Sequence, residues 1–198
     1  MKKVVIGLLL VLMLLIASNV HREQNIQQGI SEKILRFHVL ANSDSDEDQD
    51  VKLKVRDGVG VYVEKLLAQS DSRKETEQIL NDNMDEIIDR ANEILNENGM
   101  KYQATARIAQ VEFPDKTYGR YTFPAGNYRA LQIKLGKAAG HNWWCVLYPS
   151  LCFIEDTYGV VTEEKKEDLK SVLTTEEFLE ILEKPEEKKR IRFGFRWF

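Results

Sequence analysis

The pattern of hydrophobic and polar positions changes several times along the chain, and each change predicts a different element. Residues 4–17 are apolar without interruption, whereas residues 19–32 (NVHREQNIQQGISE) are polar and without period, as in a tether. Residues 34–41 (ILRFHVLA) alternate, with apolar side chains on one face and Arg36 and His38 on the other. This alternation predicts a half-buried strand directly after the tether.

Two segments with helical periodicity come next. Ser45, with Asp48 three residues later, predicts a helix start, and valines three and four positions apart then form a buried stripe. Ser72 with Glu75 predicts a second start, after which the apolar period continues as one amphipathic helix until Gly99 can end it.

After this helix the period falls to two, which predicts strands. Within 101–113 the apolar side chains stand at even-numbered positions up to Ile108 and at odd-numbered positions from Val111. A bulge near Ala109 would keep both sets on the same face of the strand. Residues 128–136 alternate with Gln132 and Lys134 outward, and two further strands are expected on either side of Tyr148-Pro149-Ser150.

The C-terminal region adds two more expected elements. A short helix is predicted from Thr175 to Lys184, because Pro185 would stop it. The tail at 190–197 alternates Arg with apolar side chains, which favours a final strand over a segment lying on a membrane surface. The order of strand, two helices and then several strands predicts an α+β fold, with a mainly antiparallel sheet and helices packed on one face.

The N-terminus predicts export. MKK is a basic n-region, and an apolar run of this length matches a signal h-region but is short for a bilayer span of about 20 residues. Cleavage after Ala17 would place the large Leu15 at −3, so a cleaved signal and a retained anchor both remain open. The expected organisation is a signal peptide or anchor at 1–18, a polar linker at 19–32, an α+β domain at 33–155 and a charged extension at 156–198.

The chain has 198 residues and a formal net charge of −4. Its length suffices for one domain with a real core. Its charge argues against nucleic acid as the main partner, because phosphate binding needs a basic surface.

Cys145 and Cys152 are the only cysteines, and paired cysteines of exported proteins are usually bonded. Six residues separate them across a Pro-centred bend, so a disulfide is expected, with two reduced, buried thiols as the alternative. A thiol nucleophile at Cys145, activated by His38 or His141, would need a reduced thiol outside the cell and an orienting group that the sequence does not show.

Metal binding has two candidate clusters, and neither matches a known ligand motif. The D-x-D-x-D-x-D run from Asp44 resembles a calcium loop, but Gln49 and Val55 stand where an EF-hand needs Gly and Glu. His38 and His141 lack a close ligand pair for zinc. We therefore expect no metal, no cofactor and no catalytic set.

Trp143 and Trp144 would point to opposite faces of a strand, so at most one of them enters a one-sided core. The other either anchors a partner on the surface or packs at a second interface within the fold, and the sequence favours neither.

Two longer stretches carry a family resemblance. FHVLANSDSDEDQDVKLKVRD (37–57) and FPAGNYRALQIKLGKAAGHNWWCVLYPSLCF (123–153) closely resemble the stage II sporulation protein R family of endospore-forming Firmicutes. Their L-A-N-S-D-S and N-W-W-C-V-L-Y-P-x-L-C-F segments are highly specific. The similarity covers about residues 30–155 and leaves the C-terminal region unmatched.

The resemblance implies a secreted or N-terminally anchored signalling protein rather than an enzyme. Members of the family are exported into the space between the forespore and mother-cell membranes. There they activate stage II sporulation protein GA, a membrane-embedded aspartic-type protease that processes pro-sigma-E. The competing class is a cell-envelope hydrolase or a metal-binding envelope protein that uses His38 and His141, and a structural envelope protein is a third. Membrane contact is expected through the N-terminal segment, with the C-terminal tail as a second candidate.

The family brings no active-site motif to carry over, so the contact surface is inferred from the residues themselves. Polar and aromatic groups on loops commonly carry recognition, which favours a surface that combines the N-S-D-S-D loop with the G-H-N-W-W-C corner. The expected partner-binding residues are Asn42, Asp44, Asp46, His141, Asn142 and one of Trp143 and Trp144.

Overall fold

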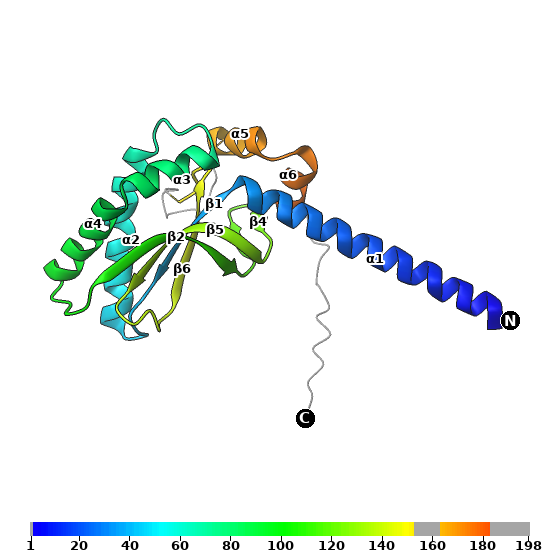
Figure 1. The fold of residues 1–198 in the computed structure, drawn as a ribbon, viewed down its shortest axis with the longest axis horizontal. Helices are drawn as coiled ribbons and strands as arrows, with labels where there is room; N and C mark the ends of the chain where they lie inside the picture. The colour runs from blue at the N-terminus through cyan, green and yellow to red at the C-terminus, as the bar shows by residue number, and fades with distance from the viewer. Residues whose placement is uncertain (1, 153–162, 183–198) are drawn as a thin grey trace, which may run out of the picture.

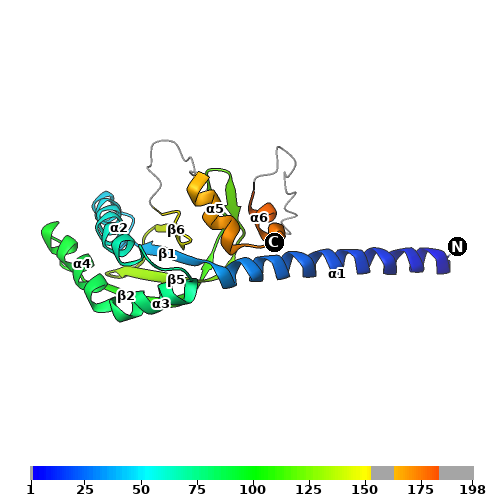
Figure 2. The ribbon, with the colours of Figure 1, turned by 90° about the horizontal axis from the view of Figure 1, so that it is seen from above.

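The computed structural model describes residues 2–152 and 163–182, and a four-stranded sheet organises them (Figures 1 and 2). The elements in chain order are α1 (Lys2–Lys33), β1 (Leu35–Leu40), α2 (Asp46–Leu66), α3 (Arg73–Asp82), α4 (Met84–Glu97), β2 (Ala104–Phe113), β3 (Lys116–Tyr118), β4 (Tyr121–Phe123), β5 (Gly126–Leu135), β6 (Asn142–Tyr148), α5 (Glu163–Val172) and α6 (Thr175–Ile181).

The strands of the sheet lie in the order β2-β5-β1-β6, and β3 and β4 form a separate hairpin. β1 runs parallel to β5 and antiparallel to β6, while β2 is antiparallel to β5. This arrangement confirms the predicted α+β class and mainly antiparallel sheet. Helices pack on the second face of the sheet as well as on the first.

Each face of the sheet carries its own hydrophobic core. The first core packs α2, α3 and α4 on one face, through side chains such as Phe37 and Leu131. The second core packs the end of α1, the hairpin, α5 and α6 on the other face, through side chains such as Tyr128 and Val146. We call these the helix face and the second face.

The two cores explain two differences from the expected strands. β1 lies between two strands, and Arg36 and His38 are buried on the second face, so the half-buried interpretation is wrong. β2 pairs with β5 in one unbroken register from Ala104 to Phe113, so the predicted bulge near Ala109 is wrong too. The parity switches because the N-terminal half of β2 packs into the first core and its C-terminal end into the second.

The helix starts follow the sequence. Ser45 caps α2 by accepting a hydrogen bond from Asp48 N, and Ser72 caps α3 by accepting one from Glu75 N. The single helix expected after Ser72 is instead two helices, because the chain leaves helical geometry at Asn83, where the side-chain Nδ2 donates to Ile79 O at 2.8 Å. Gly99 ends α4 with φ +74°, as predicted.

Residues 19–32 are helical, which corrects the interpretation of this segment as a tether without period. They continue α1, and Ile26 and Ile30 are buried in the second core. α6 lies against this part of α1, where Lys33 Nζ and Glu177 Oε2 form an ion pair at 2.5 Å. A Cβ at Gly29 would overlap Glu177 Oε1, so glycine allows the two helices to approach.

The N-terminal half of α1 projects away from the sheet (Figure 1), and its apolar side chains from Val4 to Ile16 are exposed. By length and composition, α1 could cross a membrane, a criterion that an N-terminal signal sequence also meets. An export signal or anchor at the N-terminus is compatible with this helix.

Some expected elements are placed differently or lie outside the described residues. α5 was not predicted, and α6 is described as far as Ile181 rather than Lys184. The strand expected to follow Ser150, from 151 to 155, lies mostly outside the described residues. The tail strand at 190–197 lies wholly outside them.

Candidate functional site

The loop after β1 and the start of β6 meet at the end of the sheet opposite to α1 (Figure 1). Leu40 pairs with Asn142 across the two strands, and Gly140 N donates to Ala41 O at 3.0 Å. We call this corner, formed by residues 42–46 and 141–142, the distal corner. It brings together Asn42, Asp44, Asp46, His141 and Asn142, which the sequence proposed as one surface.

Asp44 and His141 form the exposed part of the distal corner. Asp44 Oδ1 accepts a hydrogen bond from His141 N at 2.6 Å and lies 2.6 Å from His141 Nδ1. The side chains of Asp44 and His141 are 56% and 78% exposed. Asp46 is also exposed, in the first turn of α2. These groups are available to a partner.

Asp48 holds the corner in place from beneath. Its carboxylate accepts hydrogen bonds from Asn42 Nδ2 at 2.9 Å, from Ser43 Oγ at 2.5 Å and from Tyr102 Oη at 2.5 Å. Burial alone would raise the pKa of Asp48, but the hydrogen bonds outweigh burial and hold that pKa below its ordinary value. Asp48 therefore supports the loop from within, whereas Asp44 and Asp46 of the same run are exposed, so their carboxylates do not converge on one point.

Lys52 and Tyr102 are supporting residues that sequence reasoning missed. Lys52 is buried, donates to His141 O at 3.3 Å and so joins α2 to the loop before β6. Burial lowers the pKa of Lys52, with Arg56 adding to the effect and Asp44 opposing it. Lys52 follows Val51 in the buried valine stripe of α2, and this position could have indicated that Lys52 is buried. Nothing in the sequence around Tyr102 indicates that Tyr102 contacts Asp48.

His38 lies on the second face and makes hydrogen bonds through both ring nitrogens. Its Nε2 is 2.9 Å from Asn142 Oδ1, and its Nδ1 is 3.2 Å from Gln132 Nε2. Burial lowers the pKa of His38 to about 4, with Lys134 adding to the shift and the bond to Asn142 opposing it. The imidazole is therefore neutral at pH 7, with Nε2 as donor and Nδ1 as acceptor.

The two tryptophans both pack within the fold, on opposite faces of β6. Trp143 meets Phe37 edge to face, with ring centroids 5.5 Å apart, and the Arg56 guanidinium lies 5.2 Å from its ring. Trp144 stacks on His38 with centroids 3.8 Å apart. Each is half-buried, so each has both an internal contact and an exposed part.

Cys145 and Cys152 are free thiols that lie beside each other. Cys152 Sγ donates to Val146 O at 2.9 Å, and Cys145 Sγ donates to the same oxygen at 3.7 Å. Burial raises the pKa of Cys152, and the neighbouring Cys145 raises it further. The raised pKa does not favour Cys152 as a nucleophile, and the disulfide between the two cysteines remains a prediction.

A buried arginine at the centre of the second core is another feature that the sequence did not reveal. Arg36 is fully buried, and its Nε donates to Cys145 O at 3.0 Å. Its guanidinium lies 4.4 Å from the ring centroid of Phe113 and 5.1 Å from that of Tyr128. No carboxylate among the described residues pairs with it, so aromatic faces, a backbone carbonyl and the Tyr118 hydroxyl, to which Nη2 donates at 3.2 Å, stabilise this charge.

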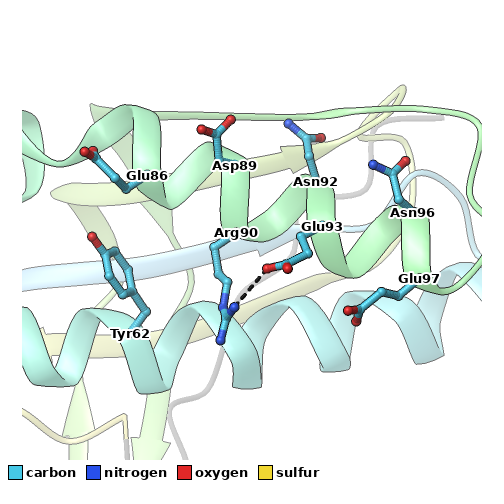
Figure 3. A pocket seen from close by; sticks show the side chains of 8 residues that line it. All are labelled: Tyr62, Glu86, Asp89, Arg90, Asn92, Glu93, Asn96 and Glu97. Atoms are coloured by element: carbon cyan, nitrogen blue, oxygen red, sulfur yellow. Dashed lines mark hydrogen bonds and ion pairs between the residues drawn. The ribbon is translucent and has the colours of Figure 1, made fainter.

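A groove of about 840 Å³ lies between α2 and α4, the two helices that pack on the helix face of the sheet (Figure 3). Figure 3 shows Glu86, Asp89 and Asn92 along one side of α4, and Arg90 bonded to Glu93 at 2.8 Å on the side toward α2. The groove contains none of the residues proposed from the sequence. Its acidic lining is exposed, as expected of a solvated helix surface.

Within residues 2–152 and 163–182, no group of three or more His, Cys, Asp and Glu side chains could hold a metal ion. His38 is buried on the second face, whereas His141 is exposed and paired with Asp44. The two histidines therefore do not converge on one site.

Comparison with known proteins identifies the family. The family model for stage II sporulation protein R matches residues 31–158. The stage II sporulation protein R of Bacillus subtilis (strain 168) is 33% identical over an alignment 198 positions long, which covers 96% of this chain and 88% of that protein. No solved structure matches. The chain therefore belongs to the stage II sporulation protein R family.

Proposed function

We propose that this protein is an exported signal that acts during sporulation by activating the membrane protease stage II sporulation protein GA. The protease would then process pro-sigma-E. Family membership supports the sporulation role, and the resemblance described above implies this receptor. In this proposal the chain breaks no bond itself and acts in the space between the forespore and mother-cell membranes.

The position of the distal corner relative to α1 is the observation that carries this proposal. α1 is apolar along its projecting half and joined to the domain through Ile26 and Ile30. The corner lies at the opposite end of the sheet, where Asp44 and His141 are exposed. A protein held by α1 in one membrane, either permanently or during export, would present this corner to a receptor.

Activation requires that the signal bind the active state of the protease more tightly than the inactive state. Moving an equilibrium from 1:99 to 99:1 takes about 5.5 kcal/mol of differential binding. Asn42, Asp44, Asp46, His141 and Asn142 would supply part of it. Trp143 and Trp144 contribute to the core, so truncating either would confound a test of the surface.

The test is processing of pro-sigma-E in a non-sporulating host that produces the protease and the pro-protein. We expect processing with the full chain, none with a chain that lacks residues 1–17 and stays in the cytosol, and a strong loss with Asp44→Lys and His141→Ala together. Glu97→Lys, a reversal on the exposed surface of α4, serves as a matched control and should process normally. Processing without the signal chain, or with its cytosolic form, would refute the proposal.

The competing hydrolase hypothesis would require His38 and His141 to act on one substrate. His38 is buried and bonded through both nitrogens, which does not favour that role. Assay of the purified chain on cell-envelope substrates, together with elemental analysis, would distinguish the two hypotheses.

A further inference from the structure

The helices and the hairpin that the structure describes cover the second face of the sheet over only part of its length. At the end where β1 begins, Tyr128 and Val146 are buried beneath α1, the hairpin and the C-terminal helices. Toward the distal corner none of the described elements covers this face, and Thr105 and Arg107 of β2 are exposed. We call the uncovered part the open half-face; its members are Thr105, Arg107, Gln132, Lys134, Asn142 and Trp144.

The open half-face is positively charged. The register of the four strands directs no carboxylate to the second face at any position. Because Thr105 pairs with Lys134 and Arg107 with Gln132, Arg107 and Lys134 are diagonal neighbours, about 7–8 Å apart at the backbone. Neither forms an ion pair with a residue that the structure describes.

The floor of this surface is a row of hydrogen-bonded side chains in which one oxygen has no partner. Asn142, His38 and Gln132 form a row of hydrogen bonds, and Trp144 stacks on His38. Gln132 is 7% exposed, and its Oε1 accepts no hydrogen bond. A buried carbonyl oxygen without a hydrogen bond is unfavourable, so this oxygen favours a ligand that brings a donor.

We propose that the open half-face extends the receptor-binding surface beyond the distal corner, which it adjoins at Asn142, and that it binds an acidic, extended segment of the receptor; this rests on the function proposed above. Carboxylates of the segment pair with Arg107 and Lys134, an apolar side chain covers Trp144, and a backbone N–H satisfies Gln132 Oε1. A second copy is disfavoured as the occupant, because a symmetric face-to-face contact would set like charges against each other.

Charge reversal tests the inference in the full chain. Arg107→Glu with Lys134→Glu should weaken binding to the detergent-solubilised protease by more than about tenfold. The matched control, Lys65→Glu with Lys74→Glu, makes the same change in net charge at exposed positions of α2 and α3, which pack on the helix face, and should bind like wild type. Unfolding temperatures establish that each variant is folded. Added salt should weaken the wild type more than the reversed variant.

The outcomes separate this inference from the proposed function. If the wild type neither binds nor activates the protease, the proposed function fails, and this inference fails with it. If the wild type and the folded reversal variant activate it equally, only the open half-face is refuted. Equal losses in the reversal variant and the control would also refute it, because they would show an effect of net charge alone.

A photo-cross-linking side chain at Thr105 identifies the occupant, with the same probe at Glu97 on the other side of the molecule as a control. An adduct at Thr105 with an acidic segment of the protease, absent at Glu97, is the expected result. An adduct with a second copy of this chain, with the chain's own residues, or with nothing would overturn the inference.

Discussion

Replacing Asp48 by Asn should weaken the support of the distal corner while leaving its exposed side chains unchanged. The Asp48 carboxylate accepts hydrogen bonds from Asn42, Ser43 and Tyr102. An asparagine at this position keeps one oxygen but turns an NH₂ group toward groups that themselves donate. The variant therefore loses charge-assisted bonds and gains a buried donor without an acceptor.

The expected loss follows from these contacts. A hydrogen bond to a charged group contributes about 1.5–3 kcal/mol, and such contributions do not add fully within one network. We expect Asp48→Asn to lower the free energy of unfolding by about 2–4 kcal/mol, and Tyr102→Phe, which removes one donor, by about 1–2 kcal/mol. Since both changes act on one interaction, the double variant should lose less than the sum of the two.

Urea unfolding of the full chain in detergent, followed by tryptophan fluorescence, measures these values. The pKa of Asp48 is lower in the folded than in the unfolded chain. Its stabilisation is therefore present above the unfolded pKa of 3.8 and is lost as the pH falls through the folded value. A change below about 0.5 kcal/mol at pH 7 for Asp48→Asn, or fully additive effects in the cycle, would refute this account.

Three further predictions concern other parts of the molecule. The pKa of His38 is about 4 in the folded chain against 6.5 when unfolded, so its contribution to the free energy of unfolding is complete above pH 6.5 and falls by about 3 kcal/mol as the pH drops toward 4. Urea unfolding at pH 7 and 4.5 should therefore show a smaller fall in the free energy of unfolding for His38→Gln than for wild type, and an equal fall would contradict the prediction. Gly29→Ala should lower the free energy of unfolding by about 1–2 kcal/mol, because the new Cβ displaces the Glu177 side chain. An increase of about 1 kcal/mol, which helix propensity alone would give, would show that α1 and α6 are not in close contact. Cys145 and Cys152 of exported protein should react with a maleimide only after unfolding and reduction, and labelling after unfolding alone would exclude the disulfide.

The sequence predicted those features that depend on local chemistry. Ser45 and Ser72 start helices through side-chain oxygens a few bonds away, and Gly99 ends one through its own backbone. The residues of the distal corner were also grouped correctly, because the two loops follow strands that the alternation made visible. Their role in partner binding remains a prediction.

The features that were missed depend on contacts distant in sequence. The alternating pattern placed Arg36 and Gln132 in solvent, because it considers only the polarity of each residue. In the structure the Arg36 guanidinium is buried by aromatic rings such as Phe113, which belongs to another strand. The isoleucines of α1 are too sparse among polar residues to form a pattern, although Ile26 and Ile30 lie one turn apart and pack into the second core. A second core on the opposite face of the sheet has no local signal.

Reconstitution with purified components tests the central claim most directly. The full chain and the receptor protease, in liposomes with pro-sigma-E as substrate, allow cleavage to be measured against the concentration of the chain. We predict that cleavage rises from near zero, saturates with the chain, and disappears when the protease alone carries an inactivating substitution. Cleavage that is independent of the chain, or that persists with the inactivated protease, would contradict the account.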